Sequence, residues 1–431
     1  MSTSTTPASA VARQSVAGAR YAWLLIGLLW LAAFLISAGR STLIAVMPQL
    51  RDEFTLSATQ LALVNSTSFW IYAVGAFFFG RIGDGSRRSV LIVGGLAFWS
   101  IATGLAPLAS VFAFLLAARG LVALGEATYF PTGAALISDW HPARSRTRAL
   151  SLHQTGVFAG AGLGALFAGL LADRYGWRLP FVVLCALGLL TCIILFRWLR
   201  DPGLDAARLA GASSRDPLRT ILRRPAALCI CAVFLLASAA SAGLYVWAPT
   251  FLHDERGLDL AGAAFFGSVT MNLAGFACAP VGALIAEKLS GSTPLASFYT
   301  LALGLALAGA CLLLLPFAHS AGAVGAVLLA SSAGKALFDG CIYAAMHEVV
   351  PAEARSTAVG LMTMVGFCGA GVTPIFIAQA SSAIGMAIAM TAMALPYALG
   401  VALLLGAGSV LRRAVLELRG ADNSEQTQPS S

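Results

Sequence analysis

Residues 200–224, RDPGLDAARLAGASSRDPLRTILRR, form the longest polar interruption in a chain that is otherwise mostly apolar. The segment contains six arginines together with Pro202 and Gly203, and it is too polar to cross a membrane. Six apolar segments precede it and six follow it. Because each has about the 20 residues that a helix needs to span a bilayer, we predict an all-α membrane protein with twelve transmembrane helices in two pseudo-symmetric six-helix halves.

The predicted helices cover residues 21–48, 58–80, 89–108, 110–138, 148–172, 179–199, 225–249, 260–287, 294–316, 321–346, 356–380 and 385–411. The corresponding parts of the chain are an N-terminal tail (1–20), a first half (21–199), a linker (200–224), a second half (225–411) and a C-terminal tail (412–431).

The composition is typical of a membrane protein. Of the 431 residues, 58% are apolar and 11% are charged, and the mean hydropathy is +0.83. Soluble domains carry about 25% charged residues, so a soluble enzyme, a disordered protein and a nucleic-acid module are excluded. The eight cysteines lie in apolar segments without CxxC spacing or a nearby His pair. We therefore expect no disulfide framework, metal site or cofactor, and no enzyme.

The basic residues predict the orientation. Of the 27 lysines and arginines, four lie on one side of the predicted membrane, three lie within helices, and the remaining 20 lie on the other side. The four are Arg51, Arg174, Arg178 and Arg256. Because cytoplasmic loops carry the excess of basic residues, both termini are predicted to be cytoplasmic. The net charge of +8 then reflects topology, and no nucleic-acid partner is expected.

Corresponding motifs recur in the two halves. Pro48 and Pro249 each precede a short charged run, and Pro142 and Pro351 each precede an arginine four residues later. Parallel repeats joined by a cytoplasmic connector are typical of one large class of secondary transporters.

The segment GRIGDGSRR, residues 80–88, resembles the signature between helices 2 and 3 of the major facilitator superfamily. It retains Gly80, Asp84 and the basic pair Arg87 and Arg88, but it has Gly85 where the family has Arg and is one residue shorter. In that family this loop latches the cytoplasmic ends of the two halves during alternating access. The resemblance implies the same gate role for these four retained residues.

Three shorter motifs resemble the anion:cation symporter branch of that superfamily, to which the spinster-type lipid transporters are near relatives. They are Trp70-Ile71-Tyr72-Ala73, Arg119 followed by Gly125-Glu126-Ala127, and Gly176-Trp177-Arg178. The resemblance covers residues 20–412 and implies a small-molecule transporter.

Five charged residues lie inside predicted membrane helices. They are Arg40, Arg119, Glu126, Lys335 and Asp339. A charge at the bilayer centre costs at least about 2.5–3.5 kcal/mol, so each is a candidate functional residue. The repeat places Lys335 at the position that corresponds to Glu126. Lys335 and Asp339 either face a central cavity or form a local ion pair one helical turn apart.

The resemblance also implies individual roles. In the symporter branch an Asp-Arg pair in helix 1 acts with the helix 4 Glu: the carboxylates carry protons and the Arg meets the substrate anion. Here that pair is Gly39-Arg40, so proton coupling is left open, with Glu126 and Asp339 as candidates for coupling or charge relay. The predicted substrate-binding residues are Arg40, Tyr72, Arg119, Gln154 and Lys335.

Neutral and aromatic side chains in the helices are further candidate contacts. They are Asn65, Tyr245, Trp247, Asn272 and Tyr343. His153 and His347 lie near predicted cytoplasmic helix ends, and we interpret both as hydrated surface residues.

These observations predict a secondary active transporter of the cell inner membrane that takes up a small organic anion, a carboxylate or sugar acid, with protons or another cation. Two alternatives stay open: an exporter of amphiphilic, lipid-like or drug-like molecules, and a transporter-like sensor without flux. We expect the protein to be a monomer.

Overall fold

The computed structural model describes residues 7–85, 87–141, 143–201, 217–351 and 354–426. Within these ranges the regular structure is helical, and no strand occurs. Eleven of the described helical segments are long and apolar enough to cross a membrane. The predicted segment 58–80 lies in a further helix, Ala58–Gly85, which is not one of the eleven. The all-α membrane architecture is therefore confirmed, and the number of twelve spans stays a prediction.

The first half consists of α1 (Pro7–Ala45), α2 (Met47–Phe54), α3 (Ala58–Gly85), α4 (Arg88–Leu105), α5 (Phe112–Trp140), α6 (Ala143–Tyr175) and α7 (Arg178–Trp198). The second half consists of α9 (Pro217–Leu222), α10 (Pro225–Arg256), α11 (Leu260–Ala264), α12 (Thr270–Ser290), α13 (Ala296–Leu312), α14 (Ala321–His347), α15 (Arg355–Ile384), α16 (Met386–Thr391), α17 (Ala394–Gly406) and α18 (Gly408–Gln426). A π-helical turn, η2 (Phe265–Val269), joins α11 to α12.

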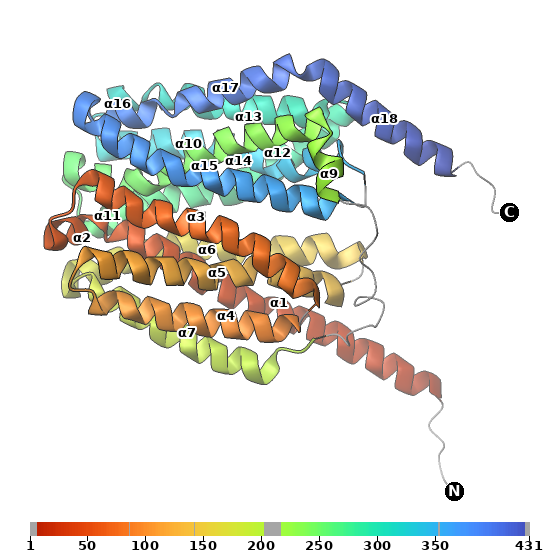
Figure 1. Ribbon diagram of the computed structural model, residues 1–431, viewed down its shortest axis with the longest axis horizontal. Helices are drawn as coiled ribbons and strands as arrows, with labels where there is room; N and C mark the ends of the chain where they lie inside the picture. The colour runs from red at the N-terminus through yellow and green to blue at the C-terminus, as the bar shows by residue number, and fades with distance from the viewer. Residues whose placement is uncertain (1–6, 86, 142, 202–216, 352–353, 427–431) are drawn as a thin grey trace, which may run out of the picture.

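The two halves lie side by side, the first drawn in red to yellow-green and the second in green to blue (Figure 1). Both chain ends emerge at one end of the bundle, and α2 and α11 lie at the opposite end. We call this opposite end the outer end, and the side of the membrane that it faces stays a prediction. The helix that contains the first predicted span begins at Pro7, so residues of the predicted N-terminal tail extend α1 beyond the bundle.

Three of the four basic residues that were predicted on the non-cytoplasmic side form ion pairs at the outer end. The pairs are Arg51 with Asp254, Arg178 with Glu53, and Arg256 with Glu255. Pairing neutralises these arginines, which agrees with an end of the protein that carries little net positive charge.

A stripe of glycines on α6 packs against α1. A Cβ atom at Gly160 would overlap the carbonyl group of Phe34, and one at Gly164 would overlap Ala38. Small residues allow the two helix backbones to approach this closely. The Trp30 indole also donates a hydrogen bond of 2.9 Å to Thr155 across the same interface. The α1–α6 pair is therefore closely packed along much of its length.

Two seams between the halves are marked by hydrogen bonds. At the first, between α3 and α15, the Trp70 indole donates to the Cys368 carbonyl at 3.2 Å. At the second, between α6 and the α11–α12 segment, the carboxylate of Asp173 accepts hydrogen bonds from the backbone N–H groups of Leu260 and Ala261. Together with the Arg51–Asp254 pair, the Asp173 contacts join the two halves at the outer end.

Candidate functional site

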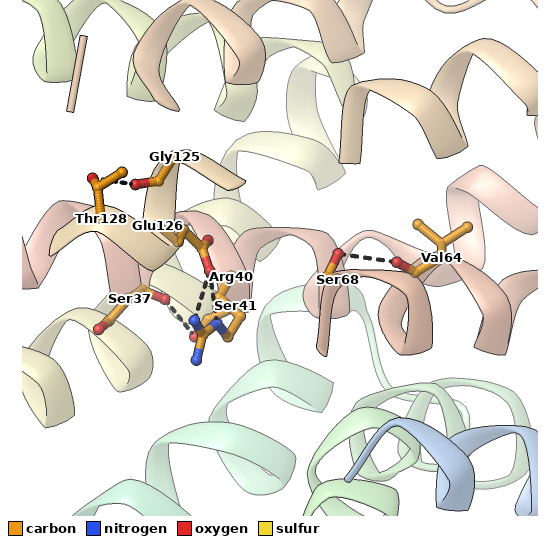
Figure 2. Close-up of polar contacts among 8 residues, drawn as sticks. All are labelled: Ser37, Arg40, Ser41, Val64, Ser68, Gly125, Glu126 and Thr128. Atoms are coloured by element: carbon orange, nitrogen blue, oxygen red, sulfur yellow. Dashed lines mark hydrogen bonds and ion pairs between the residues drawn. The ribbon is translucent and has the colours of Figure 1, made fainter. Parts of the chain in front are cut away.

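Arg40 on α1 and Glu126 on α5 form an ion pair within the first half. Arg40 Nη2 lies 2.6 Å and Nε lies 3.2 Å from the same Glu126 oxygen, Oε2 (Figure 2). The Glu126 side chain is 2% exposed, whereas that of Arg40 is 26% exposed. The carboxylate is thus buried behind the guanidinium, and Nη1 of Arg40 makes no described hydrogen bond. Donors on Arg40 stay available to an anion, because guanidinium carries five N–H groups.

Two aromatic rings lie beside the guanidinium of Arg40. Its Cζ lies 5.2 Å from the Tyr72 ring centroid and 6.0 Å from that of Phe367. The two rings are 4.7 Å apart and come from different halves, Tyr72 from α3 and Phe367 from α15. Cation–π attraction stabilises the positive charge here. We call Arg40, Glu126, Tyr72 and Phe367 the Arg40 site.

Arg119 lies near this site but has a different environment. Its side chain is 2% exposed on α5, and its Nε has no hydrogen-bond partner among the described residues. Arg119 and Glu126 attract each other electrostatically, and Glu126 Oε1 is likewise buried without a partner. A buried charge without hydrogen bonds is costly, so an incompletely satisfied guanidinium is an unusual feature. Arg119 was predicted as a substrate contact, and the structure places it within electrostatic range of both Glu126 and Arg40.

Gly39 shows why no second carboxylate occurs beside Arg40. A Cβ atom built at Gly39 would lie 2.6 Å from Cζ2 of Trp99, whose side chain is completely buried. The position where the symporter branch has Asp is therefore filled by the Trp99 indole. Glu126 remains the one carboxylate in contact with Arg40 among the described residues.

A chain of neutral hydrogen bonds crosses from the first half to the second next to Arg40. The Ser41 hydroxyl lies 2.7 Å from that of Tyr245 on α10. The side chain of Asn272 also interacts with the Tyr245 hydroxyl, and its Nδ2 donates to the Ser268 carbonyl at 2.9 Å. Tyr245 and Asn272 were predicted as neutral contacts, whereas Ser41 was missed although it directly follows Arg40.

Lys335 and Asp339 form a separate pair on α14. Lys335 Nζ lies 2.5 Å from Asp339 Oδ1, four residues further along the helix, and 5.1 Å from the Phe338 ring centroid. The geometry is that of the local ion pair considered as an alternative above. Asp339 is 45% exposed within a membrane-spanning helix, a position that suits a water-filled space better than lipid. The proposed roles of both residues in substrate binding and relay stay predictions.

Gln154 and the four residues of the predicted gate motif make no described contact with the Arg40 site. Gln154 is exposed on α6 and makes none of the contacts described above. Gly80 and Asp84 lie in the last turns of α3, but their side chains are outside the described part of the chain. Arg87 is exposed at the start of α4, and Arg88 is partly buried. The gate role of this motif stays a prediction.

The interpretation of His153 as a hydrated surface residue is wrong. Its side chain is 4% exposed, and its Nε2 lies 2.8 Å from the Tyr129 hydroxyl. That hydroxyl also bonds to the carbonyl of Leu29, so the contact joins α1, α5 and α6. The position of His153 near a predicted helix end does not reveal this contact. The contact depends on which face of α6 is turned toward α5.

Comparison with known proteins identifies similar sequences. The family described as Major Facilitator Superfamily matches residues 29–374. Human protein spinster homolog 1 is 29% identical over 325 residues, which are 69% of this chain and 60% of that protein. The hexuronate transporter of Bacillus subtilis (strain 168) is 26% identical over 239 residues, 54% of this chain and 57% of that protein. Probable anion transporter 4, chloroplastic, of Oryza sativa subsp. japonica is 29% identical over 236 residues, 50% of this chain and 39% of that protein.

The chain thus spans less than two thirds of the length of these curated relatives. Among solved structures, the fold is similar to that of a bacterial homologue of the human lysosomal transporter spinster in an inward-facing and occupied conformation. The TM-score is 0.80 at 21% identity, and the match covers 91% of this chain and 98% of that one. This likeness confirms the all-helical membrane fold that the sequence predicts.

Proposed function

The chain belongs to the major facilitator superfamily, and from this membership we propose that it transports a small organic anion by alternating access, with Arg40 as the anion-binding group. Its relatives include spinster-type proteins and hexuronate and anion transporters. Because this family consists of transporters, the prediction that the chain is not an enzyme is confirmed. Substrate, direction and coupling are the parts that we propose.

The observation that carries the proposal is the partly exposed guanidinium of Arg40 at the interface of the two halves. Phe367 from the second half lies beside it, and Glu126 from the first half uses only one carboxylate oxygen to bind it. A substrate carboxylate bound to Arg40 would therefore contact both halves at once. Arginine binds carboxylates with paired hydrogen bonds, which supports a carboxylate or sugar acid as substrate.

Protons are the proposed coupling ion, and Glu126 is the proposed carrier. The carboxylate of Glu126 competes with a substrate anion for the same guanidinium. Protonation of Glu126 would weaken its hold on Arg40 and leave that charge for the substrate. Anion and proton would then bind together, which is the requirement for symport.

The test is counterflow of radiolabelled D-glucuronate into proteoliposomes, with and without an inward proton gradient. We expect exchange by the wild type, stimulation by the gradient, and at least a hundredfold loss in Arg40→Ala, because bidentate charge-assisted bonds contribute about 1.5–3 kcal/mol each. Arg412→Ala, which removes an exposed arginine on α18, is the matched control and should retain exchange. Unchanged exchange in Arg40→Ala would contradict the site.

A second candidate function is export of an amphiphilic anion. The paired rings of Tyr72 and Phe367 lie next to the charge and offer an apolar contact for the tail of a lipid-like substrate. Separate transport assays with D-glucuronate and with oleate, a carboxylate with an apolar tail, distinguish the two candidate functions. Oleate transport without D-glucuronate exchange would favour the exporter.

The remaining parts of the proposal concern the oligomeric state, the membrane and the orientation of the protein. We propose a monomer in the cell inner membrane with both termini in the cytoplasm, supported by the basic residues near the end from which both termini emerge. Protease accessibility of terminal tags in right-side-out and inside-out vesicles tests the orientation.

A further inference from the structure

The hydrogen bond between Ser41 and Tyr245 has a defined direction. The Ser41 hydroxyl donates its proton to the Ser37 carbonyl at 3.0 Å. Its oxygen is then an acceptor, so Tyr245 must be the donor in their 2.7 Å contact. The Tyr245 hydroxyl proton of the second half therefore depends on an acceptor from the first half.

Tyr245 lies next to packed and hydrogen-bonded residues of its own half. Gly267 in η2 packs on α10, where a Cβ atom would lie 2.8 Å from the Pro249 nitrogen, four residues beyond Tyr245. The Asn272 side chain interacts with Tyr245, and its Nδ2 donates to the Ser268 carbonyl of the π-helical turn. π-helical turns are frequent at functional sites. The Tyr245 hydroxyl lies between these second-half contacts and Ser41 of the first half.

The same hydroxyl lies near the anion-binding group. Ser41 is the residue after Arg40, and Tyr245 and Arg40 interact electrostatically. An anion bound at Arg40 would bring oxygen acceptors close to Tyr245. A charged oxygen accepts a stronger hydrogen bond than a serine hydroxyl does, so the exchange of partners is favourable.

We propose that Tyr245 is the group through which the second half senses the substrate: it donates to Ser41 when the site is empty and to a substrate oxygen when the site is filled. This inference rests on the proposed anion transport at Arg40. Tyr245 is thereby a specificity-determining residue on the second half, and substrate binding releases a bond between the halves.

The exchange of partners makes a prediction that a fixed structural bond does not. Removing Ser41 as a competitor should strengthen substrate binding, and only while the Tyr245 hydroxyl is present. We expect Ser41→Ala to lower the D-glucuronate concentration for half-maximal counterflow by about tenfold, the equivalent of ~1.4 kcal/mol. In a Tyr245→Phe background, Ser41→Ala should leave that concentration unchanged within about twofold.

Thermal unfolding without substrate tests the empty state. Ser41→Ala should lower the Tm of the wild type more than it lowers the Tm of Tyr245→Phe. Tyr397→Phe, which alters a buried tyrosine on α17, is the control background and should leave both effects of Ser41→Ala intact. Equal effects of Ser41→Ala in the wild type and in Tyr245→Phe, or weaker substrate binding in Ser41→Ala, would overturn the inference. A lack of D-glucuronate exchange by the wild type would instead contradict the proposed substrate. Additive Tm shifts of Ser41→Ala and Tyr245→Phe would refute the hydrogen bond between Ser41 and Tyr245.

Discussion

Arg51 on α2 and Asp254 on α10 join the two halves at the outer end through two hydrogen bonds between one guanidinium and one carboxylate. Each side chain is about one third exposed, so the pair contributes about 0.2–1 kcal/mol to the closed outer end. A contribution of this size can hold the end closed and still allow it to open in each transport cycle.

Arg51→Asp should disturb this closure by placing two acids opposite each other. We expect D-glucuronate counterflow to fall severalfold, and the double variant Arg51→Asp/Asp254→Arg to recover at least half of the lost rate. Glu255→Gln is the control, because Glu255 pairs with its neighbour Arg256 within α10. Failure of the charge exchange to restore any rate would show that the pair does not contribute to closure.

Gly39→Ala should destabilise the protein. The added methyl group meets the buried Trp99 ring at 2.6 Å, and overpacking of this kind costs about 1–3 kcal/mol. Gly27→Ala, on the same helix with nothing within 4 Å, is the matched control. The measurement is the Tm of both variants in detergent, and equal Tm values would refute the close packing.

Arg119→Met should abolish transport without weakening the fold. Replacing a buried charge whose hydrogen bonds are incomplete, as at Nε of Arg119, by an apolar side chain is often neutral or stabilising. We expect the unfolding free energy to stay within about 1 kcal/mol of the wild type or to increase, while counterflow is lost because Glu126 loses a neighbouring cation. A large drop in Tm would mean that Arg119 is a structural residue.

The ion pair of Glu53 and Arg178 should make the outer end sensitive to acid. The guanidinium of Arg178, with the Trp177 indole N–H, holds the pKa of the Glu53 carboxyl below its ordinary value. A lowered pKa in the folded state stabilises the protein above the unfolded pKa of about 4.3, and this stabilisation is lost as the pH falls through the folded value. Glu53→Gln should therefore lower the Tm at pH 7 and have little effect near pH 3.

The control for that comparison is Glu417→Gln, which alters an exposed glutamate on α18 and should leave the Tm unchanged at both pH values. An equal effect of Glu53→Gln at the two pH values would contradict the lowered pKa.

The helices and the charged membrane residues follow from the sequence, because apolar runs of sufficient length and intramembrane charges are local properties. The resemblance implied that the helix 1 arginine acts with the helix 4 Glu, and the structure pairs Arg40 with Glu126. For Lys335 the sequence left two arrangements open, and the structure has the local ion pair with Asp339. Which side chains meet depends on the rotation of each helix about its axis, and periodicity within a single helix leaves that rotation relative to its neighbours undefined.

The contribution of Phe367 was also not predictable. It is one of 24 phenylalanines, and nothing local distinguishes it from those that face lipid. Trp99 and His153 belong to the same class, since their importance arises from contacts with Gly39 and Tyr129 on other helices. Ser41 could have been found from its position next to Arg40.

The glycine stripe of α6 has a mechanical consequence. The backbones of α1 and α6 are nearly in contact, as at Gly160 and Phe34, so no layer of side chains between them can deform. We therefore expect the two helices to move as one rigid unit. Asp173 lies on α6 and contacts the second half at the outer end, whereas Arg40 lies on α1 of the same rigid unit. We therefore expect a displacement of Asp173 from α11 to change the orientation of Arg40.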